Sequence, residues 1–460
     1  MKTSIVFGDG WLDVTLPEGT REATAGLTAK VPPVTDLDEA LARALAEPLG
    51  SPPLRERARG ARSVTIAFDD PTVPCFVPVW EKAIDAVLAE LRLAGVGPEA
   101  VRLICANALH RKFTERELAG ILGERLVAEF HGRLACHDAE DADGLVYLGT
   151  TASGHDVELN RAVADTDLTV YVNASAFRGF HGGWKSVCVG LSTWRSIRWH
   201  HTPERMTMSV DRSPMHQILD EMGAVVDAKL GADRVFKIET LLANPLQAGK
   251  IWAGRTADTR RAAVEAIRSS TPPRREMLEG KADVVVYGVP AWSPYAAYAR
   301  MNPLLTLLST GLGYLGGVVN ALGKPGCSVI LATPCGDGWD EVHHPSYREV
   351  WERVLPATRG EPERGLAFAD ELSSRRDYLE AYREGFGFHA VHPLMGLFPL
   401  VRLRHAARVY VAGITEPALA RHAGLEPTAT VEEAMERALG HHGPSASVTL
   451  VRYPAAFNRQ

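Results

Sequence analysis

The sequence predicts an α/β fold with two domains, each built on a mainly parallel sheet flanked by helices. Short β-branched and apolar runs alternate with longer stretches of helical periodicity along both halves of the chain. A proline- and arginine-containing segment at 271–275 separates the halves, and a new series of strand patterns follows it. The 460 residues, 46% of them apolar, suffice to bury two cores. We therefore expect one domain at 1–270 and another at 276–460.

The first half carries regular strand and helix signals. Thr114 and Glu117 have the spacing of a capping box, so a helix is expected to begin just after Thr114. Other helices are predicted at 77–93, 213–230 and 256–270. Strands are predicted at 63–68, 101–106, 145–148, 167–172, 234–242 and 250–253.

The second half repeats the alternation. Strands are predicted at 282–288, 327–332, 408–412 and 447–451, with helices after Pro303, between 347 and 384, and at 431–439. No charged residue falls between Arg300 and Lys324, a length that could cross a bilayer. The segment also contains asparagines, threonines and glycines, so we expect a buried helix or two there and no membrane span.

Composition argues against several classes of protein. Charged residues make up 23% of the chain and the net charge is -6, with no basic face of the kind that nucleic-acid binding needs. The six cysteines form no Cys-x-x-Cys pair, as is typical of reduced thiols in a cytoplasmic protein. The apolar run in 1–8 is too short for a signal peptide. We expect a cytoplasmic protein that binds neither nucleic acid nor membrane.

Chemically useful residues follow several of the predicted strands. Asp69-Asp70, His110, residues 173–185 and residues 288–295 each come directly after a strand pattern. Ligands of open α/β sheets bind beyond the carboxyl ends of the strands, where such loops converge. We therefore expect one shared site between the two domains.

The segment from Gly179 to His201 carries the most specific pattern. The pair Gly182-Gly183 lets the backbone approach a bound group closely, and Lys185 can bond covalently to a carbonyl-type carbon. Histidine, here at 200 and 201, is a common metal ligand. On residue types alone the segment also fits an ordinary turn followed by surface or core histidines.

This segment resembles the cofactor-attachment signature of the lactate racemase family, which uses a nickel-pincer nucleotide. Gly182-Gly183, Lys185, Gly190 and His201 stand at the positions of that signature. The resemblance implies that Lys185 tethers the cofactor, a pyridinium bis-thiocarboxylic acid mononucleotide nickel complex. It also implies that His201 binds the nickel ion and that Gly182 and Gly183 border the cofactor.

Two more segments resemble motifs of the family. Asp70-Pro71-Thr72-Val73-Pro74 resembles Asp-x-Thr-Arg-Pro, which implies that Asp70 and Thr72 bind the cofactor. Val73 stands where the family has the arginine that holds the substrate carboxylate, which points to a substrate other than lactate. His110, within Ala-Leu-His-Arg, resembles the family's catalytic histidine and would take the hydroxyl proton. A loop histidine that caps local backbone is the alternative.

The sequence departs from the family at the second base. Ser175 occupies the position of a second catalytic histidine, and His181 or His200 could take over that function. Arg300 occupies the place of a family lysine and could hold a carboxylate through two parallel hydrogen bonds, as could Arg178. We assign His110, His181, Arg178 and Arg300 as candidate catalytic residues.

The preferred reading is an isomerase that racemises or epimerises a 2-hydroxy acid by reversible hydride transfer to the lysine-tethered nickel-pincer nucleotide. Its partners would be the small-molecule substrate and the cofactor-synthesis proteins, with homo-oligomerisation left open. One alternative is a metal-dependent acid/base enzyme, such as a lyase, without a tethered nucleotide. Another is a catalytically inactive nucleotide-binding homologue.

Overall fold

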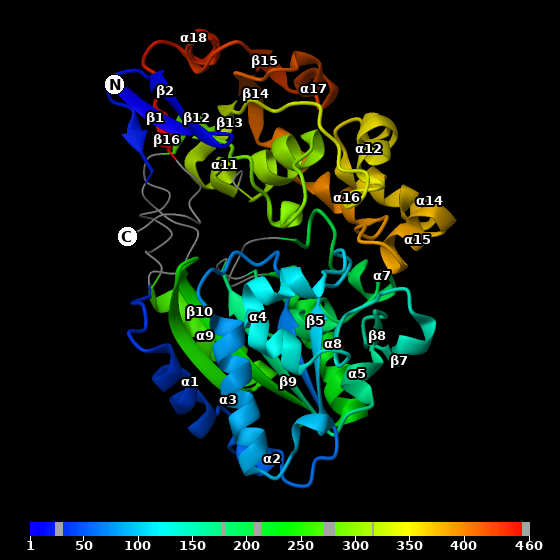
Figure 1. The fold of residues 1–460 in the computed structure, drawn as a ribbon. Coiled ribbons are helices and arrows are strands. Elements are labelled where there is room, and N and C mark those ends of the chain that lie inside the picture. Colours follow the sequence, from blue (N-terminus) through cyan, green and yellow to red (C-terminus); the bar gives the residue numbers. More distant parts are fainter. Residues whose placement is uncertain (24–30, 177–179, 207–212, 271–280, 315–316, 453–460) are drawn as a thin grey trace. The chain divides into compact units, whose positions relative to one another are not determined.

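The computed structural model describes residues 1–23, 31–176, 180–206, 213–270, 281–314 and 317–452. The chain forms two compact units, whose ribbons are shown in Figure 1. Unit 1 comprises Met1–Leu27, Pro272–Ala381 and Gly387–Gln460, and unit 2 comprises Thr28–Thr271 and Tyr382–Phe386. The predicted linker at 271–275 lies outside the described residues.

Unit 2 is built on a six-stranded sheet with the order β11-β10-β9-β4-β5-β6. All neighbouring strands are parallel except β11, which pairs antiparallel with β10. The strands are β4 (Val64–Asp69), β5 (Val101–Ala106), β6 (Leu134–Cys136), β9 (Leu168–Ser175), β10 (Val235–Asn244) and β11 (Gln247–Arg255). A separate hairpin joins β7 (Leu145–Thr150) to β8 (Asp156–Asn160). β4 and β9 are buried along their whole length, as strands covered on both faces should be.

Helices connect these strands. Helix α3 packs against α1, α2 and α4 (Figure 1). Helix α4 begins with the predicted capping box, in which the side chains of Thr114 and Glu117 each bond to the other residue's backbone N–H. The helices are α1 (Leu37–Ala46), α2 (Leu54–Arg57), α3 (Val79–Leu93), α4 (Glu115–Glu129), α5 (Arg161–Ala164), α6 (Lys185–Cys188), α7 (Trp194–Ile197), α8 (Pro214–Leu230) and α9 (Thr256–Ser270), with short turns η1 (Pro98–Ala100) and η2 (Ala142–Gly144).

Unit 1 has its own six-stranded sheet, parallel throughout, with the order β15-β14-β13-β12-β16-β3. Its strands are β3 (Arg21–Glu22), β12 (Ala282–Gly288), β13 (Gly323–Ala332), β14 (Ala406–Ala412), β15 (Glu426–Thr428) and β16 (Val448–Val451). Its larger helical segments are η4 (Leu304–Tyr314), α11 (Gly317–Leu322), α15 (Arg376–Arg383), α17 (Pro417–His422) and α18 (Val431–His442). Shorter segments are η3 (Pro294–Ala296), α12 (Tyr347–Glu349), η5 (Val350–Val354), α13 (Leu355–Thr358), η6 (Pro362–Phe368), α14 (Ala369–Ser373), α16 (His392–Gly396) and η7 (Phe398–Arg404).

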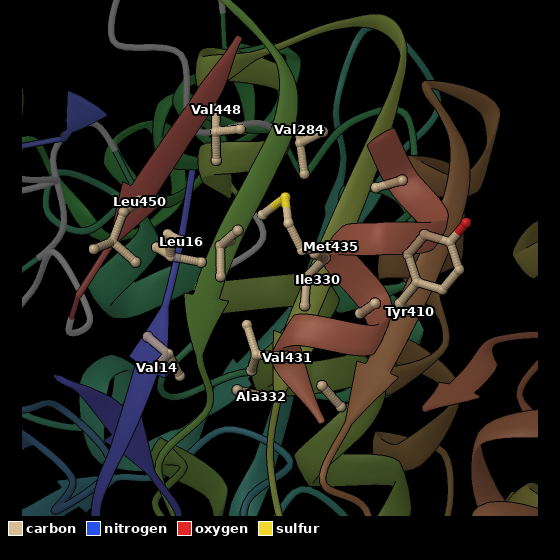
Figure 2. Packing of buried hydrophobic residues seen from close by; sticks show 14 of the residues in the cluster. Val14, Leu16, Val284, Ile330, Ala332, Tyr410, Val431, Met435, Val448 and Leu450 are labelled. Atoms are coloured by element: carbon tan, nitrogen blue, oxygen red, sulfur yellow. The ribbon is translucent and has the colours of Figure 1, made fainter. Parts of the chain in front are cut away.

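The N-terminal residues belong to unit 1, which differs from the predicted domain at 1–270. Strands β1 (Lys2–Phe7) and β2 (Gly10–Thr15) form an antiparallel hairpin. Buried side chains of this region, including Val14 and Leu16, pack with residues of the unit 1 sheet such as Val284 and Ile330 (Figure 2). The hairpin buries its apolar side chains in that core, so the chain starts in unit 1 before it builds unit 2.

The uncharged segment between Arg300 and Lys324 forms η4 and α11, followed by the start of β13. The described side chains at 304–312 are fully or almost fully buried within unit 1. Of the helices that the structure describes, none combines the length and apolar character of a membrane span.

The predicted α/β class with mainly parallel sheets is confirmed. Predicted strands 101–106 and 282–288 and helix 256–270 coincide with β5, β12 and α9. The sequence patterns missed the hairpin of β1 and β2 and the helix α1. Helix α1 carried a usable signal, because Asp36 caps its start and its buried residues Leu41, Ala44 and Leu45 have helical spacing.

Candidate functional site

The candidate site lies at the carboxyl edge of the unit 2 sheet, where the strand order reverses. From β4 the chain continues outward through β5 and β6 on one side, while β9 and β10 lie on the other side. β4 is therefore paired with both β5 and β9. Such a switch point opens a crevice beyond the strand ends, the usual ligand position in this class of fold.

Asp69, the last residue of β4, ties this strand to β9. Its carboxylate accepts hydrogen bonds from the Tyr171 hydroxyl at 3.0 Å, the Asn173 amide at 2.9 Å and the Ala174 backbone N–H at 2.7 Å. Burial raises the pKa of Asp69 to about 6, although these hydrogen bonds and the charge of Lys237 oppose the rise. Asp69 thus holds the carboxyl ends of β4 and β9 together.

Asp70 and His110 form a hydrogen-bonded pair beside this link. Asp70 Oδ2 lies 2.7 Å from His110 Nδ1, and Asp70 Oδ1 accepts from the Thr72 hydroxyl at 2.6 Å and from its backbone N–H at 3.2 Å. The Asp70 side chain is 4% exposed and that of His110 is 20% exposed. The carboxylate therefore fixes the proton on Nδ1 in the neutral ring and leaves Nε2 as the basic nitrogen.

The loop after β5 is held so that His110 keeps this position. Ala108 has a φ of 49°, in the left-handed region, and the His110 N–H bonds to the Asn107 carbonyl at 2.7 Å. The Asn107 side-chain amide donates to the carbonyls of His110 and His137, each at 3.1 Å. The orientation of His110 thus depends on the strained backbone at Ala108 and on the hydrogen bonds of the buried Asn107 side chain.

Arg111, the next residue, is an anchor of this loop. Its guanidinium is 1% exposed and bonds to both carboxylate oxygens of Glu117, at 2.7 and 3.2 Å. Glu117 is also the capping residue of α4. The Arg111 cation lowers the pKa of Glu117, against its partial burial. The bonds between Arg111 and Glu117 therefore link the loop that carries His110 to the capping box of α4.

Lys185 begins α6 directly after a glycine turn. Gly182 and Gly183 have φ angles of 89° and 59°, which other residues rarely adopt. The half-buried Lys185 amine lies 3.8 Å from the centre of the Phe180 ring. Burial lowers the pKa of Lys185 to about 8, while Asp69 and Asp70 oppose the shift. A larger fraction of this amine is therefore neutral, and nucleophilic, near physiological pH.

The structure gives a steric reason for the glycine at position 190 of the signature. A Cβ atom there would lie 2.4 Å from the Ser186 carbonyl oxygen and 2.9 Å from the Tyr171 hydroxyl. The Gly190 carbonyl also accepts a hydrogen bond at 2.9 Å from Ala108, in the loop that carries His110. This close approach joins the segment of Lys185 to the segment of His110.

His201 is buried beside His200. Their Nδ1 atoms are 2.7 Å apart, so one ring donates a hydrogen bond to the other. Burial lowers the pKa of His200 to about 3, and the nearby charge of Lys185 contributes to the shift. The structure therefore brings the histidine pair and the candidate attachment lysine into one neighbourhood. A neutral His200 that accepts from His201 would leave His201 Nε2 as a ligand nitrogen.

His181 lies in the turn before Lys185 and is half-buried. Burial and the charge of Lys185 hold the pKa of His181 well below its ordinary range. Its carbonyl accepts a hydrogen bond from Arg260 at 2.6 Å. Ser175, where the family resemblance implies a histidine, donates at 3.2 Å to the side-chain oxygen of Asn173.

Most of the sequence-predicted residues belong to unit 2: Asp70, Thr72, His110, His181, Gly182, Gly183, Lys185 and His201. Asp70, Thr72 and His110 lie in the loops after β4 and β5, the residues from His181 to Lys185 follow β9, and His201 follows α7. Arg178 lies outside the described residues. Arg300 belongs to unit 1, where its side chain is exposed and its backbone N–H donates to Asp340 at 3.0 Å. The role of Arg300 in carboxylate binding stays a prediction.

Sequence reasoning missed residues that shape the site from β10 and α9. Lys237 and Glu239 are completely buried within β10, and Arg260 lies on α9. The sequence did contain a signal for them, since Lys237 and Glu239 stand at alternate positions of a strand that is mainly apolar. Charged residues are rarely buried without a partner, so such a pattern indicates a structural or functional role. Among the described residues, no group of three or more His, Cys, Asp or Glu side chains is arranged to hold a metal ion.

Residues 7–212 match the family model of the lactate racemase N-terminal domain. The lactate racemase of Lactiplantibacillus plantarum is 32% identical over 170 residues, which cover 36% of this chain and 38% of that protein. The lactate racemase of Thermoanaerobacterium thermosaccharolyticum is 28% identical over 189 residues, which cover 39% of this chain and 43% of that protein. The matched region thus spans less than half of either relative.

Solved structures extend the likeness over the whole chain. The lactate racemase apoprotein of Thermoanaerobacterium thermosaccharolyticum has a TM-score of 0.69 at 19% identity and covers 99% of both chains. A Thermotoga maritima protein has a TM-score of 0.53 at 13% identity, over 91% of this chain and 97% of that one. At these identities the likeness shows the shared fold.

The lowered pKa of Lys185 gives a prediction for the chain without cofactor. Trace labelling with acetic anhydride and peptide mass spectrometry should show Lys185 reacting with a midpoint near pH 8. Lys82, whose amine is paired with Asp38 and has a raised pKa, provides the control with a midpoint above that of an ordinary lysine. A Lys185 profile that coincides with the Lys82 profile would contradict the buried position of the amine.

Proposed function

The chain is a divergent homologue of the lactate racemases, and on that premise we propose that it racemises or epimerises a 2-hydroxy acid other than lactate. The names of the relatives support a racemase-type activity in general. The observation that carries the proposal is the grouping of three elements at one sheet edge: the Lys185 amine, the pair His200-His201, and the pair Asp70-His110.

These residues fit the nickel-pincer nucleotide that the family uses. Lys185 offers an amine with a pKa of about 8, and it follows a glycine turn whose positive φ angles other residues rarely adopt. His201 offers a ring whose Nδ1 is already engaged with His200, which suits a ligand that binds metal through its other nitrogen. Lys185 would hold the group covalently and His201 would bind its nickel ion. When bound, the cofactor supplies the acceptor and donor of hydride.

The chain's own residues supply proton transfer and position. His110 Nε2 takes the substrate hydroxyl proton as the α-hydrogen departs with its electron pair, which gives the 2-keto acid. Asp70 stabilises the imidazolium that forms and keeps its ring oriented. Return of the hydrogen to the opposite face, with return of the proton from His110 to the oxygen, restores the hydroxy acid with inverted configuration.

Asp70 and Thr72 are bonded so that they orient His110, a role that differs from the cofactor binding implied by the family resemblance. The sequence comparison assigned both to the cofactor, yet both oxygens of Asp70 bond within the protein, to Thr72 and His110. We place Asp70 as a positioning residue for His110. Thr72 in turn fixes the carboxylate from its other side.

The substrate is proposed to differ from lactate because two family positions have changed. Val73 replaces the arginine that would hold the substrate carboxylate, and Ser175 replaces a second histidine. We propose Arg300 or Arg178 for the carboxylate and His181 as the candidate second base. The cofactor-synthesis proteins would be required partners, since they must deliver the nucleotide.

Isotope tracing separates this proposal from its rivals. Protein made alongside the cofactor-synthesis enzymes is incubated with enantiopure 2-hydroxy acids and sugar acids in D₂O, and products are resolved by chiral chromatography and mass spectrometry. We expect loss of enantiomeric purity without deuterium at the α-carbon, because a hydride that is carried and returned does not exchange with solvent. Deuterium incorporation would favour the metal-dependent acid/base enzyme. Nickel nucleotide bound without any conversion would favour an inactive homologue.

The pair Asp70-His110 gives a mutational prediction. Asp70→Asn should lower kcat/KM about 10- to 100-fold, since a hydrogen bond to a charged group contributes roughly 1.5–3 kcal/mol. His110→Ala should lower it by roughly 10²- to 10⁴-fold. Asp167→Asn serves as the matched control, because Asp167 bonds to Arg62 and Ser63, before the start of β4. Unchanged kinetics of the Asp70 variant would remove it from the site.

A further inference from the structure

We propose that Lys237 and Glu239 are positioning residues that clamp the Gly183 backbone and thereby hold Lys185 in place. This inference rests on the proposed function in one respect, the use of Lys185 as the attachment point. The geometry of the clamp is independent of what the lysine carries.

The clamp grips both sides of Gly183. Lys237 Nζ donates to the Gly183 carbonyl at 3.0 Å, and Glu239 Oε2 accepts from the Gly183 N–H at 3.2 Å. Lys237 also donates to the hydroxyl of Ser186, the residue after Lys185. One ammonium group therefore contacts the chain just before and just after the lysine. Thr259 donates to Glu239 Oε2 at 3.3 Å and fixes the acceptor.

The two glycines are fitted to this clamp. A Cβ on Gly182 would lie 2.0 Å from Glu239 Oε1, and a Cβ on Gly183 would lie 3.0 Å from the Arg260 side chain. Arg260 also donates to the carbonyl of His181. His181 and Gly183 are thus hydrogen-bonded to charged side chains of α9 and β10, and Gly182 between them has no room for a side chain. The glycine pair is needed for its lack of side chains as well as for its backbone angles.

The buried charges of Lys237 and Glu239 are unfavourable for folding stability in the interior of a sheet. Lys237 and Glu239 are both 0% exposed, and burying charged side chains generally costs more than packing apolar residues of the same size. Burial lowers the pKa of Lys237 to about 8, while Glu239 and Asp69 favour its charged form. Glu239 Oε1 lacks a hydrogen-bond partner among the described residues. We infer that the pair is kept because it holds the turn rigid.

Lys185 depends on that rigidity. The Lys185 amine lies 3.8 Å from the centre of the Phe180 ring, and Asp69 and Asp70 favour its charged form. This placement requires that the backbone from which the side chain starts, between Gly183 and Ser186, stays fixed. If the clamp loosens, the amine can move into water, and its pKa should rise toward the 10.5 of an ordinary lysine.

The test uses the full-length chain made without cofactor, so its outcome is independent of whether Lys185 is later modified. The labelling midpoint of Lys185 is measured by trace acetylation and peptide mass spectrometry in the wild type, Lys237→Met, Lys237→Arg and Glu239→Met. Arg57→Met is the matched control, because it removes a mostly buried cation that pairs with Asp233, before the start of β10. Circular dichroism and urea unfolding identify which variants fold.

We expect the midpoint to rise by about one pH unit or more in Lys237→Met, to stay near the wild-type value in Lys237→Arg, and to be unchanged in Arg57→Met. Glu239→Met removes both the acceptor of the Gly183 N–H and the negative charge, so it separates an effect of position from an effect of charge. Loss of a nearby negative charge alone would lower the midpoint, whereas loosening of the turn raises it. An unchanged or lowered midpoint in folded Glu239→Met would overturn the proposal, and this variant decides if Lys237→Met does not fold.

Discussion

The buried carboxylate of Asp69 is the interaction on which the candidate site depends. It bonds to three groups of β9 and fixes the ends of β4 and β9 at the point where the strand order reverses. The next residue, Asp70, is thereby placed to hold His110. The charge of Lys237 also favours the ionised form of Asp69. One carboxylate therefore connects the hydrogen-bonded pair Asp70-His110 with the Lys237 side chain that holds Gly183.

Much of the fold could be predicted because strands and helices follow local periodicity. β5, β12 and α9 coincide with their predicted bounds, and the capping box of Thr114 and Glu117 is present. The placement of the N-terminal hairpin in unit 1 could not be predicted, because it depends on contacts between residues such as Val14 and Ile330 that are far apart in sequence. Chain order indicates domains only where a domain is continuous.

Only part of the candidate site could be predicted from the sequence, because motifs reveal residues within short segments of the chain. Motif resemblance pointed to Asp70, His110, Lys185 and His201, all of which belong to unit 2. It could not reveal that Asp70 bonds to His110, nor that Lys237 and Glu239 grip Gly183, because these contacts join separate strands and loops. A motif names residues that share a function, whereas the supporting residues are recognised only when the sheet is assembled.

The most direct test of the account is the mass of the peptide that contains Lys185 in protein produced alongside the cofactor-synthesis enzymes. Attachment predicts an added mass on Lys185, nickel bound in equal amount, and loss of both in Lys185→Ala with the fold retained. An unmodified Lys185 in protein that binds nickel and racemises a 2-hydroxy acid would contradict the central claim.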